Sequence, residues 1–386
     1  MNSFKYLFAR AFLSFFVLFL SCSDKNTGHK HLVKEVKPAD TISIDLRNQQ
    51  YYNQSYQLVS KSEELFLVGL DYYNQKLNFL DLNQKSFIKS VKYGSDIEEI
   101  GNIGQFYIHN FDSIFLYAPG ELSMYIIDSS GAKVNEYNFN FYNGEELSKL
   151  LTKFSFFALN AVADYNTRFY YDENMNSVLF SNIFYSQNLL SNHAYEFPVL
   201  SELRLSNEEQ SPDFQGDFPS NYHKKRVPYD IFYNFLPISP DEIYLNFSFS
   251  ENVYSKNRDS FVLKSAFDDG NETLFVKQYD PTEAEQKKLI AQDFRYIQLI
   301  YSEELNMIGR VAKHTNPSDK LKDELDSKWS VIFYDLDKKE IYQEIVFRKG
   351  IYDFKKCFIV KDKLYVIENI ANTKNENVLN IYVFKI

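Results

Sequence analysis

From about residue 40 to the C-terminus, short apolar or alternating runs are separated by turns. The runs are rich in Tyr, Phe, Ile and Val, which are the residue types that strands favour. Alternation with a period of two places every second side chain on the same face of a sheet. The pattern therefore predicts an all-β domain over residues 40–386.

Three stretches of this pattern can be aligned with one another. Each contains an apolar strand that ends in Asp, then a polar turn and a second alternating strand, at 78–93 (Asp81), 124–139 (Asp128) and 332–347 (Asp335). We interpret each stretch as a hairpin. Another strand pair precedes each hairpin, at 65–70, at 105–119 and at 296–312. A recurring group of three or four strands is the sequence pattern of a β-propeller blade.

Three further groups bring the expected number of blades to six, at 168–205, 231–279 and 352–386. Long insertions in the third and fourth groups leave counts of five or seven open. The last group is one strand short of a full blade, while Asp40–Leu46 ("DTISIDL") is a lone alternating strand. We expect this strand to complete the last blade, close the ring and remove an exposed sheet edge.

A few short helices are expected between the blades. Residues 143–157 carry apolar residues at helical spacing after a candidate cap at Asn143. Residues 280–292 offer Asp280 as a cap and Pro281 in the first turn. The charged segment 317–329 is interpreted as a solvated loop or short helix inside the fifth group.

The N-terminus carries a short apolar run, Ala11–Leu20, after Lys5 and Arg10. A membrane-spanning helix needs about 20 apolar residues, so this run is too short and is typical of a cleaved export signal. Ser21 directly before Cys22 resembles the lipobox of bacterial lipoproteins, although Phe19 stands where Leu is usual. The resemblance implies cleavage before Cys22, acylation of that cysteine and attachment to a membrane. The alternative is an ordinary signal peptide with an incidental cysteine.

The expected organisation is a signal peptide at 1–21, a flexible tether at 22–39 and a single propeller domain at 40–386. Residues 23–39 show no apolar periodicity and are rich in charge, as linkers are. His29 and His31 lie in this tether and could bind a metal, but two imidazoles on a flexible tether lack the other ligands of a closed metal site.

Composition supports a large core and argues against nucleic acid as a partner. The chain is 45% hydrophobic and 17% aromatic, unlike disordered chains. Its net charge of −10 becomes −12 once Lys5 and Arg10 are removed with residues 1–21, which contain no acid. Binding to nucleic acid depends on Lys and Arg that neutralise phosphates, so this balance opposes it. The basic cluster at 223–226 is interpreted as a solvated loop.

The mature chain would keep only Cys22 and Cys357, and an acylated Cys22 cannot form a disulfide. Cys357 lies in a strand-like run, where a free cysteine usually acts as a small buried apolar residue and not as a reactive thiol.

The lipobox, the tether, the lone "TISIDL" strand and the segment "GNIGQFYIHNFDSIFL" at 101–116 together resemble a known family. These are the uncharacterised Bacteroidota lipoproteins with a TolB-like six-bladed propeller, catalogued as domain of unknown function 4221. The resemblance implies a lipoprotein of the cell envelope. It supplies no catalytic residue.

Residues that could carry chemistry are few. Two acidic clusters occur, Asp96 with Glu98 and Glu99, in a connection between blades, and Asp268 with Asp269 and Glu272, which has the form of a hairpin turn. The sequence holds no G-x-S-x-G or H-E-x-x-H motif and no glycine-rich phosphate loop. Single histidines in such strands are usually structural, and this applies to His109, His193, His223 and His314. Trp329, the single tryptophan, is expected in the core.

The leading hypothesis is a non-catalytic, lipid-anchored propeller that binds a protein, peptide or glycan in the cell envelope. No catalytic residue and no cofactor are predicted, and the sequence leaves open whether the central channel binds a metal. The alternative is a metal-dependent hydrolase with its site at the central channel, and a third hypothesis is a structural component of an envelope complex. Several carboxylate or amide oxygens that converge in the channel would favour the hydrolase. An apolar patch on one face would favour a partner surface.

Overall fold

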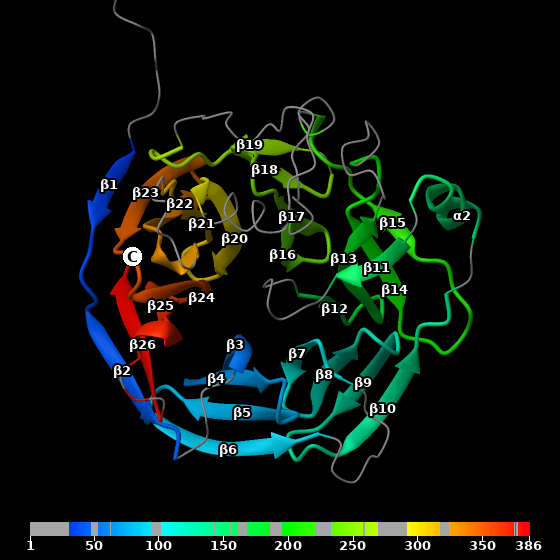
Figure 1. Cartoon of the computed structure of the whole chain (residues 1–386), viewed down its shortest axis with the longest axis horizontal. Helices are drawn as coiled ribbons and strands as arrows, with labels where there is room; N and C mark the ends of the chain where they lie inside the picture. The colour runs from blue at the N-terminus through cyan, green and yellow to red at the C-terminus, as the bar shows by residue number, and fades with distance from the viewer. Residues whose placement is uncertain are drawn as a thin grey trace, which may run out of the picture. The chain divides into compact units, whose positions relative to one another are not determined.

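The described strands form six sheets arranged around a common centre, as Figure 1 shows. The computed structural model describes residues 31–47, 53–61, 63–93, 102–141, 144–154, 156–160, 168–185, 195–220, 222, 233–257, 259–268, 292–316, 324–373, 375 and 377–386. Leu32–Ile386 form one compact unit. This unit is a six-bladed β-propeller, as the strand pattern predicts.

The first three blades follow one another along the chain. Blade 1 contains β3 (Asn53–Lys61), β4 (Glu64–Asp71), β5 (Lys76–Asp81) and β6 (Ser86–Lys92). Blade 2 contains β7 (Gln105–Asn110), β8 (Ser113–Ala118), β9 (Ser123–Ile127) and β10 (Lys133–Asn138). Blade 3 contains β11 (Phe156–Asn160), β12 (Tyr170–Asp172), β13 (Ser177–Tyr185), β14 (Leu200–Arg204) and β15 (Asp213–Gln215).

The last two blades each gain a strand from the N-terminal segment. Blade 4 contains β16 (Asn234–Ser239), β17 (Glu242–Asn246), β18 (Asn252–Ser255) and β19 (Ser260–Val262). Blade 5 contains β20 (Arg295–Ser302), β21 (Met307–Lys313), β22 (Trp329–Asp335), β23 (Glu340–Phe347) and β1 (Leu32–Glu35). Blade 6 contains β24 (Tyr352–Val360), β25 (Lys363–Glu368), β26 (Val378–Lys385) and β2 (Asp40–Asp45).

Strand β2 closes the ring as predicted. It pairs antiparallel with β26, with Asp40 opposite Val383 and Asp45 opposite Val378. Along β2, Ile42 and Ile44 are buried while their neighbours are exposed. The alternating sequence therefore places both isoleucines against the interior and leaves polar side chains toward solvent.

Strand β1 lies within residues 22–39, which the sequence predicts to be a flexible tether. Leu32–Glu35 pair in parallel with the outer strand β23, and the Glu35 carboxylate accepts a hydrogen bond of 2.8 Å from Arg348 Nε. The side chains of β1 are mostly exposed. Its pairing relies on backbone groups at a sheet edge and not on buried side chains, so no apolar period marks it in the sequence. The first described strand therefore lies at Leu32–Glu35, within the segment 22–39 that the sequence predicts to be a tether.

The three aligned stretches are hairpins, each joining the third and fourth strands of a blade: β5–β6, β9–β10 and β22–β23. The terminal aspartate has the same role in all three. Its carboxylate accepts a backbone N–H in the turn, from Asn83 to Asp81 at 2.8 Å, from Ser130 to Asp128 at 2.8 Å and from Asp337 to Asp335 at 3.0 Å. Aspartate favours such turns because its short side chain reaches its own backbone two residues on.

Short helical segments interrupt the strand pattern. Helix α2 (Glu145–Leu151) confirms the first helix, but its N-cap is Gly144, without a side-chain cap, and not Asn143. Asn143 lies outside the described residues, as do 280–291 of the second predicted helix. Of the charged segment 317–329, residues 317–323 also lie outside them, and the described part contains the 3₁₀ turn η3 (Glu324–Asp326). A second 3₁₀ turn, η4 (Ile370–Asn372), precedes β26.

The core of the propeller is divided among the interfaces between neighbouring blades. Each of six apolar clusters joins one blade to the next. Trp329 is fully buried between blades 5 and 6 and stacks on Phe347 at 4.0 Å, so its predicted core position is confirmed. The cluster between blades 6 and 1 includes Ile42 and Ile44 of β2. Strand β2, which lies near the N-terminus of the described chain, thus supplies part of the last interface of the ring.

We expect Ile44→Ala to destabilise the protein by about 2–5 kcal/mol, because it removes a fully buried side chain from this interface. The matched control is Thr41→Ala on the exposed face of the same strand, which should change stability by no more than about 0.5 kcal/mol. Urea denaturation of both variants provides the measurement. Equal midpoints for the two variants would show that β2 does not contribute to the closing interface.

Candidate functional site

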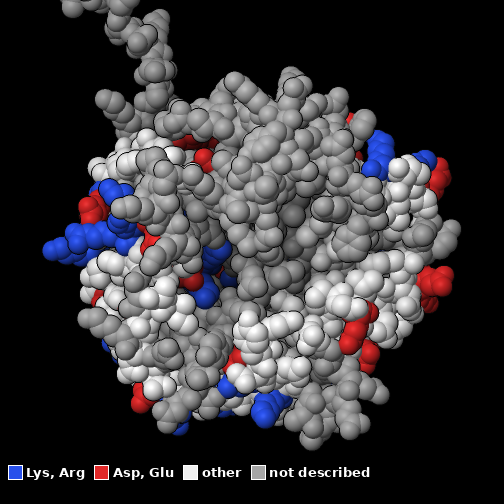
Figure 2. All heavy atoms as spheres, in the orientation of Figure 1, with Lys and Arg blue, Asp and Glu red and all other residues white. Residues whose placement is uncertain are grey.

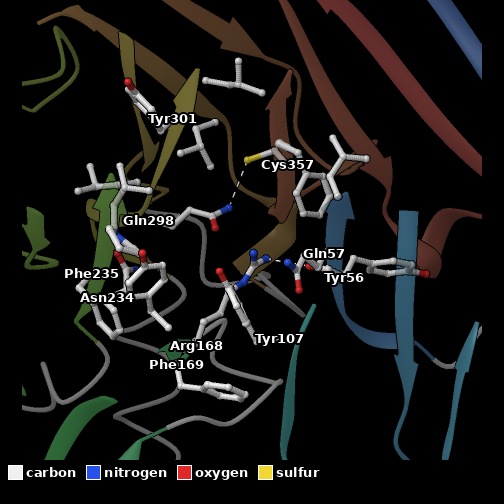
Figure 3. Close-up of a pocket in the computed structure, with 18 of the residues that line it drawn as sticks. Tyr56, Gln57, Tyr107, Arg168, Phe169, Asn234, Phe235, Gln298, Tyr301 and Cys357 are labelled. Atoms are coloured by element: carbon white, nitrogen blue, oxygen red, sulfur yellow. Dashed lines mark hydrogen bonds between the residues drawn. The ribbon is translucent and has the colours of Figure 1, made fainter. Parts of the chain in front are cut away.

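A cavity of about 330 Å³ lies at the centre of the ring. Figure 3 shows its labelled side chains, which come from strands far apart in the sequence. Every blade contributes one segment to the lining, at 56–58, 105–107, 168–170, 234–237, 298–301 and 357–360. The innermost strand of each blade therefore forms the wall. This size is at the lower end of the range for small-molecule pockets, about 300–1,000 Å³.

Amide side chains in the wall link neighbouring blades. Gln57 Nε2 of β3 donates to the Ile108 carbonyl of β7 at 3.0 Å, and the Ile108 N–H donates to Gln57 Oε1 at 2.7 Å. Gln298 Nε2 of β20 donates to the Phe354 carbonyl of β24 at 3.0 Å. Asn234 Nδ2 of β16 makes the same kind of bond to the Ile297 carbonyl of β20. These amides hold the ring together at its centre.

Among the described residues that line the cavity, Arg168 is the one whose side chain is an Asp, Glu, Lys or Arg side chain. It precedes β12, where the innermost strand of blade 3 is interrupted. Both β11 and β12 pair with β13, with Asn160 opposite Ser181 and Tyr170 opposite Leu179. The inner strand of blade 3 is therefore interrupted between Asn160 and Tyr170, and Arg168 lies two residues before β12.

The guanidinium of Arg168 reaches blades that are not adjacent in sequence to its own. One of its N–H groups donates to the Tyr56 carbonyl of blade 1 at 2.9 Å. The guanidinium carbon lies 5.9 Å from the centre of the Phe358 ring of blade 6. Burial lowers the pKa of Arg168 to about 10, so the group remains protonated at neutral pH.

Cys357 faces this cavity from β24 and is 1% exposed. Its thiol donates to the Phe354 carbonyl at 3.4 Å and accepts from Gln298 Nε2 at 3.2 Å. Burial raises the pKa of the thiol far above its ordinary value. The prediction of a small buried residue is confirmed, because nucleophilic attack requires the thiolate, which burial disfavours here.

The two described strand histidines lie on different blades. His109 of β7 packs edge-on against Tyr171 at 5.3 Å and lies 3.6 Å from Glu173. His314 follows β21 and is buried. His193 and His223, like His29 in the N-terminal segment, lie outside the described residues. His31 is described but lies next to β1, so the structure brings no histidine pair together within the part of the chain it describes.

His314 belongs to a buried hydrogen-bond network between blades 4 and 5. Its Nε2 lies 2.9 Å from Ser330 Oγ, and Ser330 donates to Glu344 at 2.5 Å. Ser265 and the Ala266 N–H donate to the same carboxylate at 2.6 and 2.8 Å. The carboxylate contacts the serine and not the histidine, which is not the order of a catalytic triad. The network fixes the segment after β19 to blade 5.

The acidic clusters do not reach the cavity within the described residues. Asp96, Glu98, Glu99, Asp269 and Glu272 lie outside the described part of the chain, while Asp268 accepts a hydrogen bond from Tyr296 at 2.8 Å. No Asp or Glu occurs among the described residues that line the cavity. The same described residues contain no group of three His, Cys, Asp or Glu side chains that could hold a metal ion. Among the described lining residues, therefore, no carboxylate is placed to bind a hard cation, and the oxygen donors of the side chains are amides and tyrosines.

The connections differ in length between the two faces of the ring. Because strands alternate in direction within a blade, the first and third connections lie on one face, and the second connection and the link to the next blade lie on the other. The first kind is short, as at 82–85, 173–176 and 336–339. Of the second kind, the structure describes only parts of several connections, such as 195–199, 216–220 and 263–268. Loops that vary without disturbing a scaffold commonly carry binding functions.

The described charged side chains on the face drawn in Figure 2 are of both signs. Figure 2 shows Lys, Arg, Asp and Glu interspersed on the described surface of one face, without an extended basic patch. Among the described residues no helix is long and apolar enough to cross a bilayer.

No sequence motif indicated in advance that Arg168 and the linking amides line the central cavity. The sequence does contain one signal for Gln57 and Gln298. The pair "Gln-Leu" recurs at 57–58 and 298–299, in the innermost strands of blades 1 and 5. A polar residue at the same place in two aromatic strands indicates a repeated structural role. For Arg168 the sequence offers no comparable repeat.

Comparison with known proteins identifies the fold. No protein-family model and no curated protein matches the sequence. A member of the domain of unknown function 4221 family from Bacteroides vulgatus has a similar structure, with a TM-score of 0.69 and 14% identity over 91% of this chain and 99% of that chain. A Bacteroides fragilis protein described as a candidate exported protein gives a TM-score of 0.50 and 10% identity over 92% of this chain and 99% of that one. The predicted resemblance to that family is confirmed at the level of the fold.

His314 should make stability depend on pH. Burial lowers its pKa in the folded protein to about 4, and Glu344 opposes this shift while Lys328 and Lys313 add to it. An unfolded histidine has a pKa of about 6.5, so the stabilisation is complete above that pH and is lost as the pH falls toward 4. We expect the free energy of unfolding to drop by on the order of 2–3 kcal/mol across this window through His314.

The measurement compares wild type with His314→Gln by urea denaturation at pH 7 and pH 4.5. Wild type must be compared with the variant because a second group also titrates in this range. Burial raises the pKa of the Asp293 carboxyl to about 6, so its protonation increases the free energy of unfolding as the pH falls. His314→Gln should lose less stability on acidification than wild type. Parallel pH curves for both proteins would contradict this account.

Proposed function

We propose that this chain is a lipid-anchored propeller of the cell envelope that binds a protein, peptide or glycan without transforming it. The observation that carries the proposal is the central cavity, to which the innermost strands of all six blades contribute. Its wall offers amides, aromatic rings and one guanidinium on a rigid scaffold, which suits recognition.

Support for the cell envelope comes from two independent sources. The N-terminal segment ends in Ser21–Cys22 after a short apolar run, which is the pattern of a lipoprotein signal. A protein of similar fold is described as a candidate exported protein. Acyl chains contribute about 0.8 kcal/mol per buried methylene, so two or more chains give stable anchoring.

The proposed anchor predicts that Cys22→Ala abolishes both metabolic palmitate labelling and retention in the membrane fraction. The matched control is Cys357→Ala, which removes the other cysteine of the mature chain and should leave both properties intact. Labelling and membrane retention of the Cys22→Ala protein at wild-type levels would refute the anchor.

The non-catalytic proposal predicts no turnover of p-nitrophenyl phosphate, p-nitrophenyl acetate or γ-butyrolactone above the buffer rate, with or without added Ca²⁺. The reason is that the described residues lining the cavity include no carboxylate that could bind Ca²⁺. Hydrolysis that requires Ca²⁺ and copurifies with the wild-type protein would favour a metal-dependent hydrolase instead.

A further inference from the structure

The outer rim of blade 5 carries a group of exposed apolar side chains. Leu32 and Val33 of β1 are 60% and 40% exposed, and Tyr342 of the neighbouring strand β23 is 51% exposed. Leu32 lies opposite Gln343, the residue that follows Tyr342, so the three side chains belong to one stretch of two paired strands. Figure 1 shows β1 at the outer edge of the ring. We call Leu32, Val33 and Tyr342 the rim cluster.

A backbone irregularity presents Tyr342 at this rim. The pairing of β23 with β22 changes register between Ile341 and Gln343, which leaves Tyr342 as the extra residue, as in a β-bulge. A bulge changes the direction of a side chain and leaves its extra residue unpaired in the ladder. Tyrosine combines an apolar ring with a polar hydroxyl, and such side chains are enriched where an apolar phase meets water.

The rims of the other blades expose fewer large apolar side chains in their described strands. The outermost strands of blades 1, 2 and 4 expose one each, which are Ile88, Val134 and Val262. The described outermost strands of blades 3 and 6 expose none. Single exposed apolar residues are usual on soluble proteins, whereas a contiguous group marks an interaction surface. The rim cluster is therefore the candidate interaction surface of the described rim.

Basic side chains outnumber acidic ones around the rim cluster. Residues 32–37, 340–349 and 328 contain Lys34, Lys37, Lys328, Arg348 and Lys349 against Glu35, Glu340 and Glu344. Glu344 is buried and accepts hydrogen bonds inside the ring, while Glu35 pairs with Arg348 at 2.8 Å. Figure 2 shows basic side chains, with acidic ones beside them, at the edge of the molecule where Figure 1 places β1. This rim therefore favours an anionic partner, although the chain as a whole has a net charge of −10.

The length of chain before β1 limits how far this rim can lie from the proposed anchor. Nine residues, 23–31, separate Cys22 from Leu32. An extended chain spans at most 3.6 Å per residue, so the distance from Cys22 to Leu32 cannot exceed about 36 Å. A compact unit of the size of Leu32–Ile386 has a diameter of roughly 50 Å, from the usual scaling of the radius of gyration. The blade 5 rim therefore stays closer to the anchored cysteine than the unit is wide, whichever way the ring turns.

We propose that the blade 5 rim lies against an anionic phospholipid surface, into which the rim cluster inserts while the surrounding basic side chains contact the lipid phosphates. The inference rests on the proposed lipid anchor and specifies how the propeller is oriented on the membrane. Apolar side chains that lie at an interface enter the boundary between headgroups and acyl chains by about 5–10 Å. Lys and Arg beside an anionic leaflet add electrostatic attraction.

This orientation agrees with the proposed binding function. Because the acyl chains on Cys22 would already hold the protein at the bilayer, the rim contacts need only to orient it. A ring that contacts the membrane by its rim leaves both of its faces in water. The central cavity then stays open to a partner.

The test measures quenching of tryptophan fluorescence by phospholipids brominated on their acyl chains. Tyr342→Trp places a reporter in the rim cluster. The matched control, Val134→Trp, places one at an exposed position on the outermost strand of blade 2, which Figure 1 shows across the ring from β1. The native Trp329 is fully buried and gives the same background in both variants. The mature lipidated chain is reconstituted into vesicles of phosphatidylcholine with phosphatidylglycerol, and into vesicles of phosphatidylcholine alone.

We expect Tyr342→Trp to be quenched about twofold more strongly than Val134→Trp in the anionic vesicles, because interfacial insertion brings the indole close to the bromine atoms. Vesicles of phosphatidylcholine alone should reduce this difference, since the attraction of the basic side chains is lost. Adding Leu32→Ser and Val33→Ser should lower the quenching at position 342 to the level of the control. Both replaced side chains are exposed, so the variant should fold and should still float with the vesicles through its acyl chains.

Quenching of Tyr342→Trp that is no stronger than that of Val134→Trp would overturn the inference, and so would equal quenching in the two kinds of vesicle. If the protein floats with the vesicles in either case, the anchor stands and only the orientation is wrong. Failure of the mature chain to float would remove the anchor and the inference together. A dimer in detergent by light scattering, with Tyr342→Trp unquenched in vesicles, would assign the rim to a second copy of the chain and contradict the membrane contact.

Discussion

The contact between neighbouring blades is the interaction on which this structure depends. Each sheet is too small to bury its apolar side chains alone, and each of the six apolar clusters is shared by two blades. The last of these contacts forms only when the N-terminal strand β2 joins β26. Stability therefore belongs to the closed ring and not to any blade, since an open ring would leave two apolar faces in water.

The same constraint shapes the central cavity. Inner strands meet around the axis, and amides such as Gln57 and Gln298 bind the backbone of the next blade. Polar groups that serve as links between blades are fixed in place, which gives the cavity a rigid wall. Arg168 reaches this space from the residues before β12 of blade 3, and its bond to the Tyr56 carbonyl links that blade to blade 1.

Much of the architecture could be predicted from local patterns. Alternation identified the strands, and Asp81, Asp128 and Asp335 marked equivalent turns because an aspartate stabilises a tight turn through its own backbone. Strand β1 could not be predicted, since backbone pairing at an edge leaves no side-chain pattern. Arg168 could not be predicted either, because its contacts with Tyr56 and Phe358 join residues that only the closed ring brings together.

The attachment of β1 to the outer edge of blade 5 also determines how the protein would respond to force. Tension applied at residue 31 acts first on the β1–β23 pairing, where Leu32 lies opposite Gln343 and Glu35 opposite Val346. Only after those pairs separate would load pass through residues 36–39 to β2 and the closing interface. Strand β1 would therefore bear an applied load before the closing interface of the ring does.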